Sequence, residues 1–77
     1  MKADVTIDCV GLYCPVPIIK TAEQIQKMAG GQVLEVIADD DGITSDMPNW
    51  CQITGHEFLG IEKTDTEYHT FIKKIVK

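Results

Sequence analysis

The most constraining feature of this sequence is a pair of prolines, Pro15 and Pro17, placed directly after an alternating, strand-like segment. Proline is tolerated in the first turn of a helix, because its fixed backbone angle fits there and its missing N–H has no intrahelical partner. No further proline or glycine occurs between Pro17 and Gly30. The two prolines therefore predict a helix that starts at Pro15, extends to Ala29 and has Cys14 as its N-cap.

Hydrophobic periodicity predicts the elements on either side of this helix. Residues 4–9 alternate between apolar and polar side chains, which is typical of a half-buried strand. Apolar residues within 15–29 recur every three or four positions and give the helix one apolar face. The apolar run at 32–38 suits an interior strand, so this part of the chain predicts a right-handed parallel crossover.

A second helix is expected after the acidic stretch that follows this strand. It spans residues 47–54 and ends at Gly55, a residue type that commonly terminates helices. Ser45 or Asp46 can cap its first turn, because a short polar side chain accepts a hydrogen bond from a free backbone N–H. Thr44 is an equally good starting point.

The remainder of the chain predicts a β-hairpin. Its strands cover residues 57–64 and 68–76, and Gly60 marks a position for a bulge. The resulting order, βαβαββ, with both helices on one face, predicts a two-layer α/β sandwich. With 77 residues, the chain has room for one domain, residues 1–77.

Cys14 is the first candidate for chemistry. A thiol at a helix start feels the positive end of the helix dipole, which favours the thiolate and lowers the pKa of the cysteine. The alternative is that Cys14 is a small buried apolar residue. The two prolines favour the reactive role, because they hold Cys14 at the junction between strand and helix.

The surrounding residues limit the reaction class. Cysteine phosphatases and rhodanese-type enzymes surround their thiolate with backbone N–H donors, and phosphatases add an arginine. This chain has no arginine, and Pro15 and Pro17 remove two donors, which leaves those of Val16 and Ile18. Thiol exchange needs mainly access and a thiolate. The pattern therefore indicates a protein that holds a terminal sulfur on Cys14 as a persulfide.

The run Cys14-Pro15-Val16-Pro17 resembles the Cys-Pro-X-Pro signature of the TusA/SirA-type sulfur-carrier family. Further matches are Ala38-Asp39-Asp40-Asp41, Thr44, Asp46-Met47-Pro48, Cys51 and Gly55-His56-Glu57. The resemblance implies a four-stranded mixed sheet in the order 1-2-4-3, with the fourth strand antiparallel to the others. It also implies a carrier that acts as a co-substrate rather than a stand-alone enzyme. Its partners would be a sulfur donor, of the cysteine desulfurase or rhodanese type, and an acceptor protein.

We expect those partners to dock on apolar side chains around the thiol: Leu12, Tyr13, Val16 and Met47. In a parallel crossover the loops after the first two strands share one sheet edge, which brings the acidic residues 39–46 close to Cys14. Their charge raises the pKa of Cys14 and opposes the helix dipole. An acidic rim would also favour a basic partner.

The other two cysteines allow different readings. Cys9 could attack a persulfide on Cys14, release the sulfur and close a disulfide, or it could be an inward-facing strand residue. Cys51, one helical turn after Met47, is expected in the core. Neither Cys9 nor Gly42, within the acidic loop, follows the family pattern.

The sequence does not favour a Cys–His enzyme site or a metal site. A Cys–His acyl-transfer enzyme would use His56 or His69 as its base, but an exposed strand position suits His69 and a helix stop suits His56. The cysteines and His56 match no common zinc spacing. The acidic stretch lacks the alternation and closing glutamate of a calcium loop. We therefore expect no metal and no cofactor.

The charge and composition of the chain limit its possible partners and its location in the cell. A net charge of −5 argues against nucleic acid as a partner. The sequence contains no apolar run of membrane-spanning or signal-peptide length, so we expect a cytoplasmic protein without membrane insertion. We also expect a monomer. The alternative to a sulfur carrier is a regulatory or structural protein-interaction module in which Cys14 is a redox-sensitive contact.

Overall fold

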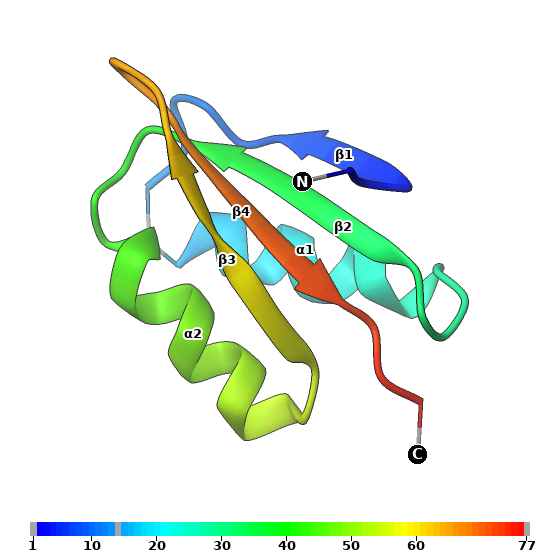
Figure 1. Ribbon diagram of the computed structural model, residues 1–77. Helices are drawn as coiled ribbons and strands as arrows, with labels where there is room; N and C mark the ends of the chain where they lie inside the picture. The colour runs from blue at the N-terminus through cyan, green and yellow to red at the C-terminus, as the bar shows by residue number, and fades with distance from the viewer. Residues whose placement is uncertain (1, 14, 77) are drawn as a thin grey trace.

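The computed structural model describes residues 2–13 and 15–76. Within them the chain forms β1 (Val5–Asp8), α1 (Val16–Gln26), β2 (Val33–Ala38), α2 (Ile43–Thr54), β3 (Glu57–Lys63) and β4 (Tyr68–Lys73). The strands form one sheet, and both helices pack on the same side of it (Figure 1). The predicted βαβαββ order and the two-layer α/β sandwich are confirmed.

The sheet has the strand order β1-β2-β4-β3. β1 and β2 are parallel, whereas β4 is antiparallel to both of its neighbours. The order 1-2-4-3 and the opposed fourth strand are therefore confirmed. The pairing of β3 with β4 shifts by one residue between Phe58 and Gly60, where Gly60 has a φ of 149°, as expected of a bulge that exploits the freedom of glycine.

The first helix differs from its predicted bounds at both ends. It begins at Val16, with Pro15 rather than Cys14 as its N-cap, so that Pro17 occupies the second helical position. The start is one residue late because Pro15 adopts a non-helical ψ of 13°. The helix ends early because the N–H groups of Lys27 and Met28 bond to carbonyls three residues back, which tightens the final turn.

The second helix begins at Ile43, four residues before the predicted start at Met47 and one residue before the alternative start at Thr44. Its N-cap is Gly42, and no side chain caps its start, so Ser45 and Asp46 lie inside the helix. Burial of Ile43 explains the difference, because the four-residue spacing of buried Met47 and Cys51 extends back to it. Pro48 lies inside this helix, where it has no N–H to donate to the carbonyl of Thr44. The end at Gly55, in the left-handed conformation, is confirmed.

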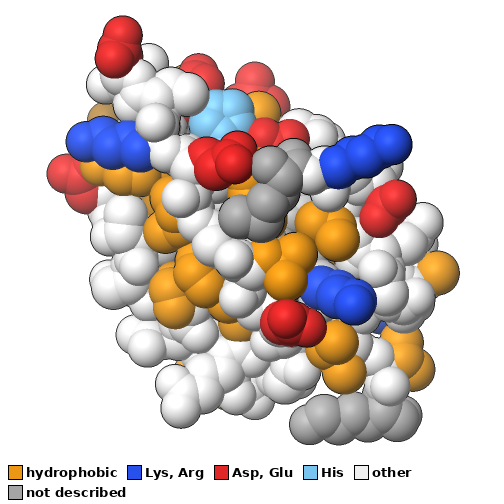
Figure 2. All heavy atoms as spheres, viewed as in Figure 1, with side chains coloured by type: hydrophobic (Ala, Val, Ile, Leu, Met, Phe, Trp, Pro, Cys, Tyr) orange, Lys and Arg blue, Asp and Glu red, His pale blue; other side chains and the backbone are white. Residues whose placement is uncertain are grey.

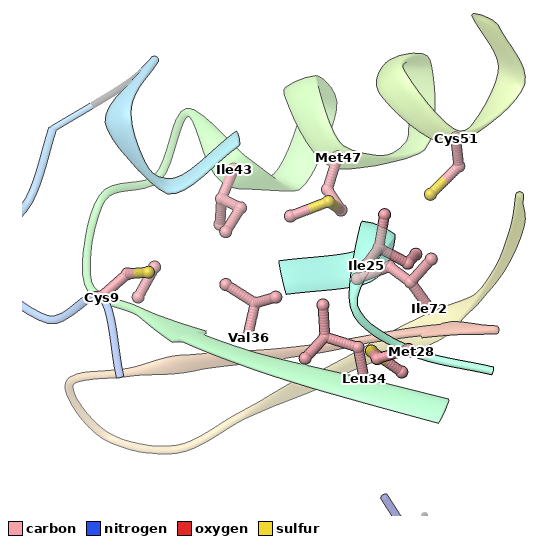
Figure 3. Packing of buried hydrophobic residues seen from close by; sticks show 10 residues of the cluster. Cys9, Ile25, Met28, Leu34, Val36, Ile43, Met47, Cys51 and Ile72 are labelled. Atoms are coloured by element: carbon pink, nitrogen blue, oxygen red, sulfur yellow. The ribbon is translucent and has the colours of Figure 1, made fainter. Parts of the chain in front are cut away.

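The hydrophobic core lies between the sheet and the helices. Side chains from α2, including Met47 and Cys51, point toward the sheet, and Leu34 and Val36 of β2 point back at them (Figure 3). The buried cluster comprises Cys9, Ile25, Met28, Leu34, Val36, Ala38, Ile43, Met47, Cys51 and Ile72. In the part of the chain that the structure describes, neither helix is long and apolar enough to cross a membrane.

Candidate functional site

The segment between β1 and α1 folds as a compact turn with exposed residues on both sides of position 14. The N–H of Leu12 donates to the carbonyl of Cys9 at 3.1 Å, and the N–H of Val16 donates to the carbonyl of Tyr13 at 2.9 Å. Cys14 itself lies outside the described residues. Its chain neighbours Tyr13 and Pro15 are both exposed, with 78% of Tyr13 accessible.

The start of α1 offers few free N–H donors to an anion. Pro15 and Pro17 carry none, and the N–H of Val16 is already bonded to Tyr13. Of the two N–H donors that the prolines leave in the first turn, those of Val16 and Ile18, the first is therefore not free to bind an anion. A phosphatase or rhodanese-type site needs several such donors around its thiolate, so the local backbone does not favour either enzyme class.

The loops after β1 and β2 meet at one edge of the sheet, as predicted from the parallel crossover. The N–H of Gly11 donates to Oδ1 of Asp39 at 3.0 Å. The hydroxyl of Tyr68, at the start of β4, donates to Oδ1 of Asp41, and this bond raises the pKa of the Tyr68 phenol. The acidic loop is therefore held beside the turn that carries position 14.

Cys9 is fully buried directly after β1, and its N–H donates to the carbonyl of Ile37 at 2.7 Å. Burial raises the pKa of the Cys9 thiol, and Asp8 adds a smaller effect in the same direction that Lys20 opposes. A thiol that is sealed and protonated is poorly placed to attack a persulfide. The structure favours the inward-facing strand residue over the resolving thiol.

Cys51 is a core residue, as expected. Its side chain is buried on α2, and burial raises the pKa of its thiol to about 11. A buried thiol with so high a pKa is chemically inert at neutral pH. Both described cysteines thus serve the packing of the core.

One predicted docking residue is misplaced. Met47 lies on α2 with its side chain fully buried against the sheet, so it offers no surface to a partner (Figure 3). Its position follows from the spacing with Ile43 and Cys51, which puts it on the inner face of the helix. Leu12 is half-buried and packs against the core, whereas Tyr13 and Val16 are exposed.

Two exposed apolar residues at this turn were missed by the sequence reasoning. Val10 is 41% accessible and Ile19 is 52% accessible. The three- and four-residue spacing of apolar residues within 15–29 includes both Ile18 and Ile19 in the apolar face, yet of these two only Ile18 packs against the core. The structure buries Pro17, Thr21 and Ile25 at a four-residue spacing that leaves Ile19 outside.

Neither histidine is placed to serve as a base near position 14. His69 is bonded through Nδ1 to Oε2 of Glu35 at 2.6 Å, on the sheet face turned away from the helices. The face of the molecule seen in Figure 2 carries several acidic side chains. His56 precedes β3, which is parallel to β1, and so lies at the opposite end of the sheet. Its Nδ1 accepts a hydrogen bond from the N–H of Ile75 at 3.1 Å.

The described residues also contain no group of three or more histidine, cysteine or acidic side chains that could hold a metal ion. The acids of the 39–41 loop instead bond to the protein itself: Asp39 to Gly11, Asp40 to the N–H of Gly42 at 3.1 Å, and Asp41 to Tyr68. Their role in the fold is to shape the edge of the sheet next to the turn.

Comparison with known proteins decides the family. The family model described as sulfurtransferase TusA matches residues 5–74. The chain belongs to the TusA family. The resemblance carried by Cys14-Pro15-Val16-Pro17 is thereby confirmed, and with it the kinship to sulfur carriers of the TusA/SirA type.

Two relatives of this TusA-family chain are each 42% identical to it over 74 residues, which is 96% of its length. One is the "Putative sulfur carrier protein YrkF" of Bacillus subtilis strain 168, and the other is a "Putative sulfur carrier protein" of Aquifex aeolicus strain VF5. The chain spans only 40% and 38% of these relatives. Among solved structures, the SirA-like protein of Desulfitobacterium hafniense superposes with a TM-score of 0.81 at 23% identity, covering 94% of this chain and 99% of that one. That likeness supports the fold.

Proposed function

We propose that this protein is a sulfur carrier that accepts sulfane sulfur as a persulfide on Cys14 and relays it to an acceptor protein. The observation that carries the proposal is the contrast among the three cysteines. Cys9 and Cys51 are buried with raised pKa values, whereas Cys14 stands between the exposed residues Tyr13 and Pro15 in the family's Cys-Pro-X-Pro motif.

The transfer is a thiol exchange that balances without an external oxidant. The Cys14 thiolate attacks the outer sulfur of a persulfide on the donor protein, the sulfur–sulfur bond of the donor breaks, and the donor thiolate leaves. The new bond makes Cys14 the persulfide. An acceptor thiolate then attacks the terminal sulfur in the same way and releases the Cys14 thiolate. Each step needs access and an ionised thiol.

The surroundings of the motif suit carriage better than catalysis. The chain has no arginine, the N–H of Val16 is bonded to Tyr13, and both histidines are engaged elsewhere. Transition-state stabilisation by preorganised donors is the usual basis of enzymatic acyl or phosphoryl transfer. A helix start with few donors and exposed flanks favours exchange between two proteins, with the chain as co-substrate.

Loading measured by intact mass tests the proposal. The protein is incubated with a cysteine desulfurase and cysteine, or with a rhodanese and thiosulfate. Its intact mass is then measured by mass spectrometry with and without reductant. We expect a reductant-labile gain of one sulfur that Cys14→Ser abolishes and Cys51→Ser retains. Loss of all loading, together with partner binding that survives Cys14→Ser, would instead support an interaction module with a redox-sensitive cysteine.

A further inference from the structure

Exposed apolar residues are concentrated in the part of the chain that flanks position 14 in sequence. Six large hydrophobic residues are exposed in the part of the chain that the structure describes. Four of them, Val10, Tyr13, Val16 and Ile19, lie within five residues of position 14. We call these four residues the apolar rim. The other two, Ile53 and Val76, lie on α2 and after β4.

The fold does not require the apolar rim. On α1, Val16 and Ile19 share an outward line with Glu23 and Gln26, at spacings of three and four residues. All four are exposed, while the inward line of the helix carries the buried residues. The outward line is therefore apolar only in its first half, next to position 14. Apolar residues clustered on a surface, with no part in the core, mark an interaction site.

Two carboxylates border the apolar rim in fixed positions. Oδ1 of Asp8 accepts a hydrogen bond from the N–H of Val10 at 2.9 Å, and Oδ1 of Asp39 accepts one from the N–H of Gly11 at 3.0 Å. Both acids are exposed. The same bonds that shape the turn therefore hold negative charge at one side of the rim.

We propose that the apolar rim is the docking surface for the sulfur-donating protein, and that lysine or arginine side chains of that protein contact Asp8 and Asp39. The proposal rests on the proposed function, since it assigns the partner of the same site. The donor surface it requires has an apolar centre and a basic border on one side. Complementary charge of this kind steers association and fixes the orientation of two proteins.

The charge distribution distinguishes this occupant from others. A second copy of the chain would bring the same acids of both copies to one interface, because the two halves of a symmetric dimer use the same patch. An anionic membrane surface would likewise repel Asp8 and Asp39, and a protein of net charge −5. A partner with basic residues beside an apolar patch satisfies both features of the surface.

Comparison of a protein donor with a small donor tests the proposal. Each variant is loaded by inorganic polysulfide and, separately, by whichever protein system loads the unmodified chain, a cysteine desulfurase with cysteine or a rhodanese with thiosulfate. For Ile19→Ser and Tyr13→Ser we expect loading by the protein donor to slow by about tenfold. Loading by polysulfide should not change, because a small donor needs no docking surface.

Ile53→Ser is the matched control, because Ile53 is 84% exposed and lies outside the apolar rim. It should load at the normal rate from both donors. Equal rates for Ile19→Ser, Tyr13→Ser and Ile53→Ser with the protein donor would overturn the docking proposal and leave the carrier function standing. Failure of every donor to load the unmodified chain would overturn the carrier function itself.

Charge is tested with Asp39→Asn, which keeps an oxygen to accept the bond from Gly11. We expect slower loading by the protein donor at low salt and a weaker dependence of the rate on salt. Asp65→Asn, in the exposed turn between β3 and β4, should behave like the unmodified chain. An unaltered salt dependence for Asp39→Asn would contradict the assignment of the carboxylates. A stable dimer in sedimentation that Ile19→Ser dissociates would assign the rim to a second copy instead.

Discussion

Nδ1 of His69 lies 2.6 Å from Oε2 of Glu35, and this contact joins β4 to β2 on the face of the sheet that the helices leave uncovered. Thr6 of β1 donates to the other oxygen of Glu35 at 3.0 Å, and Glu67 lies 3.4 Å from Nε2 of His69. Three strands are thus connected through one carboxylate. The hydrogen bond to Glu35 is the main reason that the pKa of His69 is raised above its ordinary value of 6.5.

This contact predicts a pH-dependent stability. Because the pKa of His69 is higher in the folded chain than in the unfolded one, the stabilisation is complete below pH 6.5 and disappears as pH rises through the folded pKa. We expect the unfolding free energy of the native chain to exceed that of His69→Gln by up to about 1 kcal/mol near pH 5.5. Urea unfolding from pH 5.5 to 9 measures the difference, which should shrink as pH rises. A difference that grows with pH would contradict the account.

The three cysteines should differ sharply in their reaction with iodoacetamide. At pH 8 a thiol with a pKa of about 11 is ionised in about one molecule in a thousand, and Cys51 and Cys9 are also shielded by the core. We expect native protein to be modified at Cys14 alone, and unfolded protein at all three positions. Peptide mapping after timed alkylation distinguishes them. Modification of Cys9 as fast as Cys14 in the native state would show that Cys9 is accessible.

Cys9→Ala should leave sulfur release unchanged. The buried thiol packs in the core, so its removal is expected to lower the unfolding free energy by about 1 kcal/mol without altering the fate of a persulfide on Cys14. Single-turnover transfer from the loaded variant to an acceptor thiol measures this. Slower release from Cys9→Ala than from Cys51→Ala, the matched core control, would restore the resolving role of Cys9.

Met47→Ala tests whether Met47 is a core residue rather than part of a docking surface. Truncation of a fully buried methionine costs about 2–5 kcal/mol, a large part of the roughly 4–12 kcal/mol available to a chain of this size. Ile53→Ala, at an exposed site on the same helix, should change the unfolding free energy by less than about 0.5 kcal/mol. Denaturant unfolding compares the two variants. Similar stabilities would mean that Met47 does not pack in the core.

Periodicity and turn chemistry were sufficient for the element order, the parallel crossover and the bulge at Gly60, because each depends on local pattern. The strand order came from the family resemblance. The start of α2 was predicted at Met47, with Ser45 or Asp46 as its cap, or at Thr44, whereas the observed start at Ile43 depends on the burial of that side chain. Nothing local distinguishes these alternatives.

The candidate site was predicted less completely than the fold. The proximity of Asp39 to the turn followed from the parallel crossover and is confirmed by its bond to Gly11. The exposure of Ile19 and the burial of Met47 could not be read from residue type, since both are large and apolar. Their positions depend on how α1 and α2 rotate against the sheet, which is settled by packing across the whole core.

The most direct test of the carrier account is to locate the sulfur that the protein acquires. After loading by the protein donor and removal of excess reagent, the persulfide is blocked with an alkylating agent and the chain is digested and analysed by tandem mass spectrometry. The account predicts one additional sulfur on the peptide that contains Cys14 and none on those of Cys9 and Cys51. Additional sulfur on Cys9 or Cys51 in place of Cys14, or on no cysteine, would contradict it.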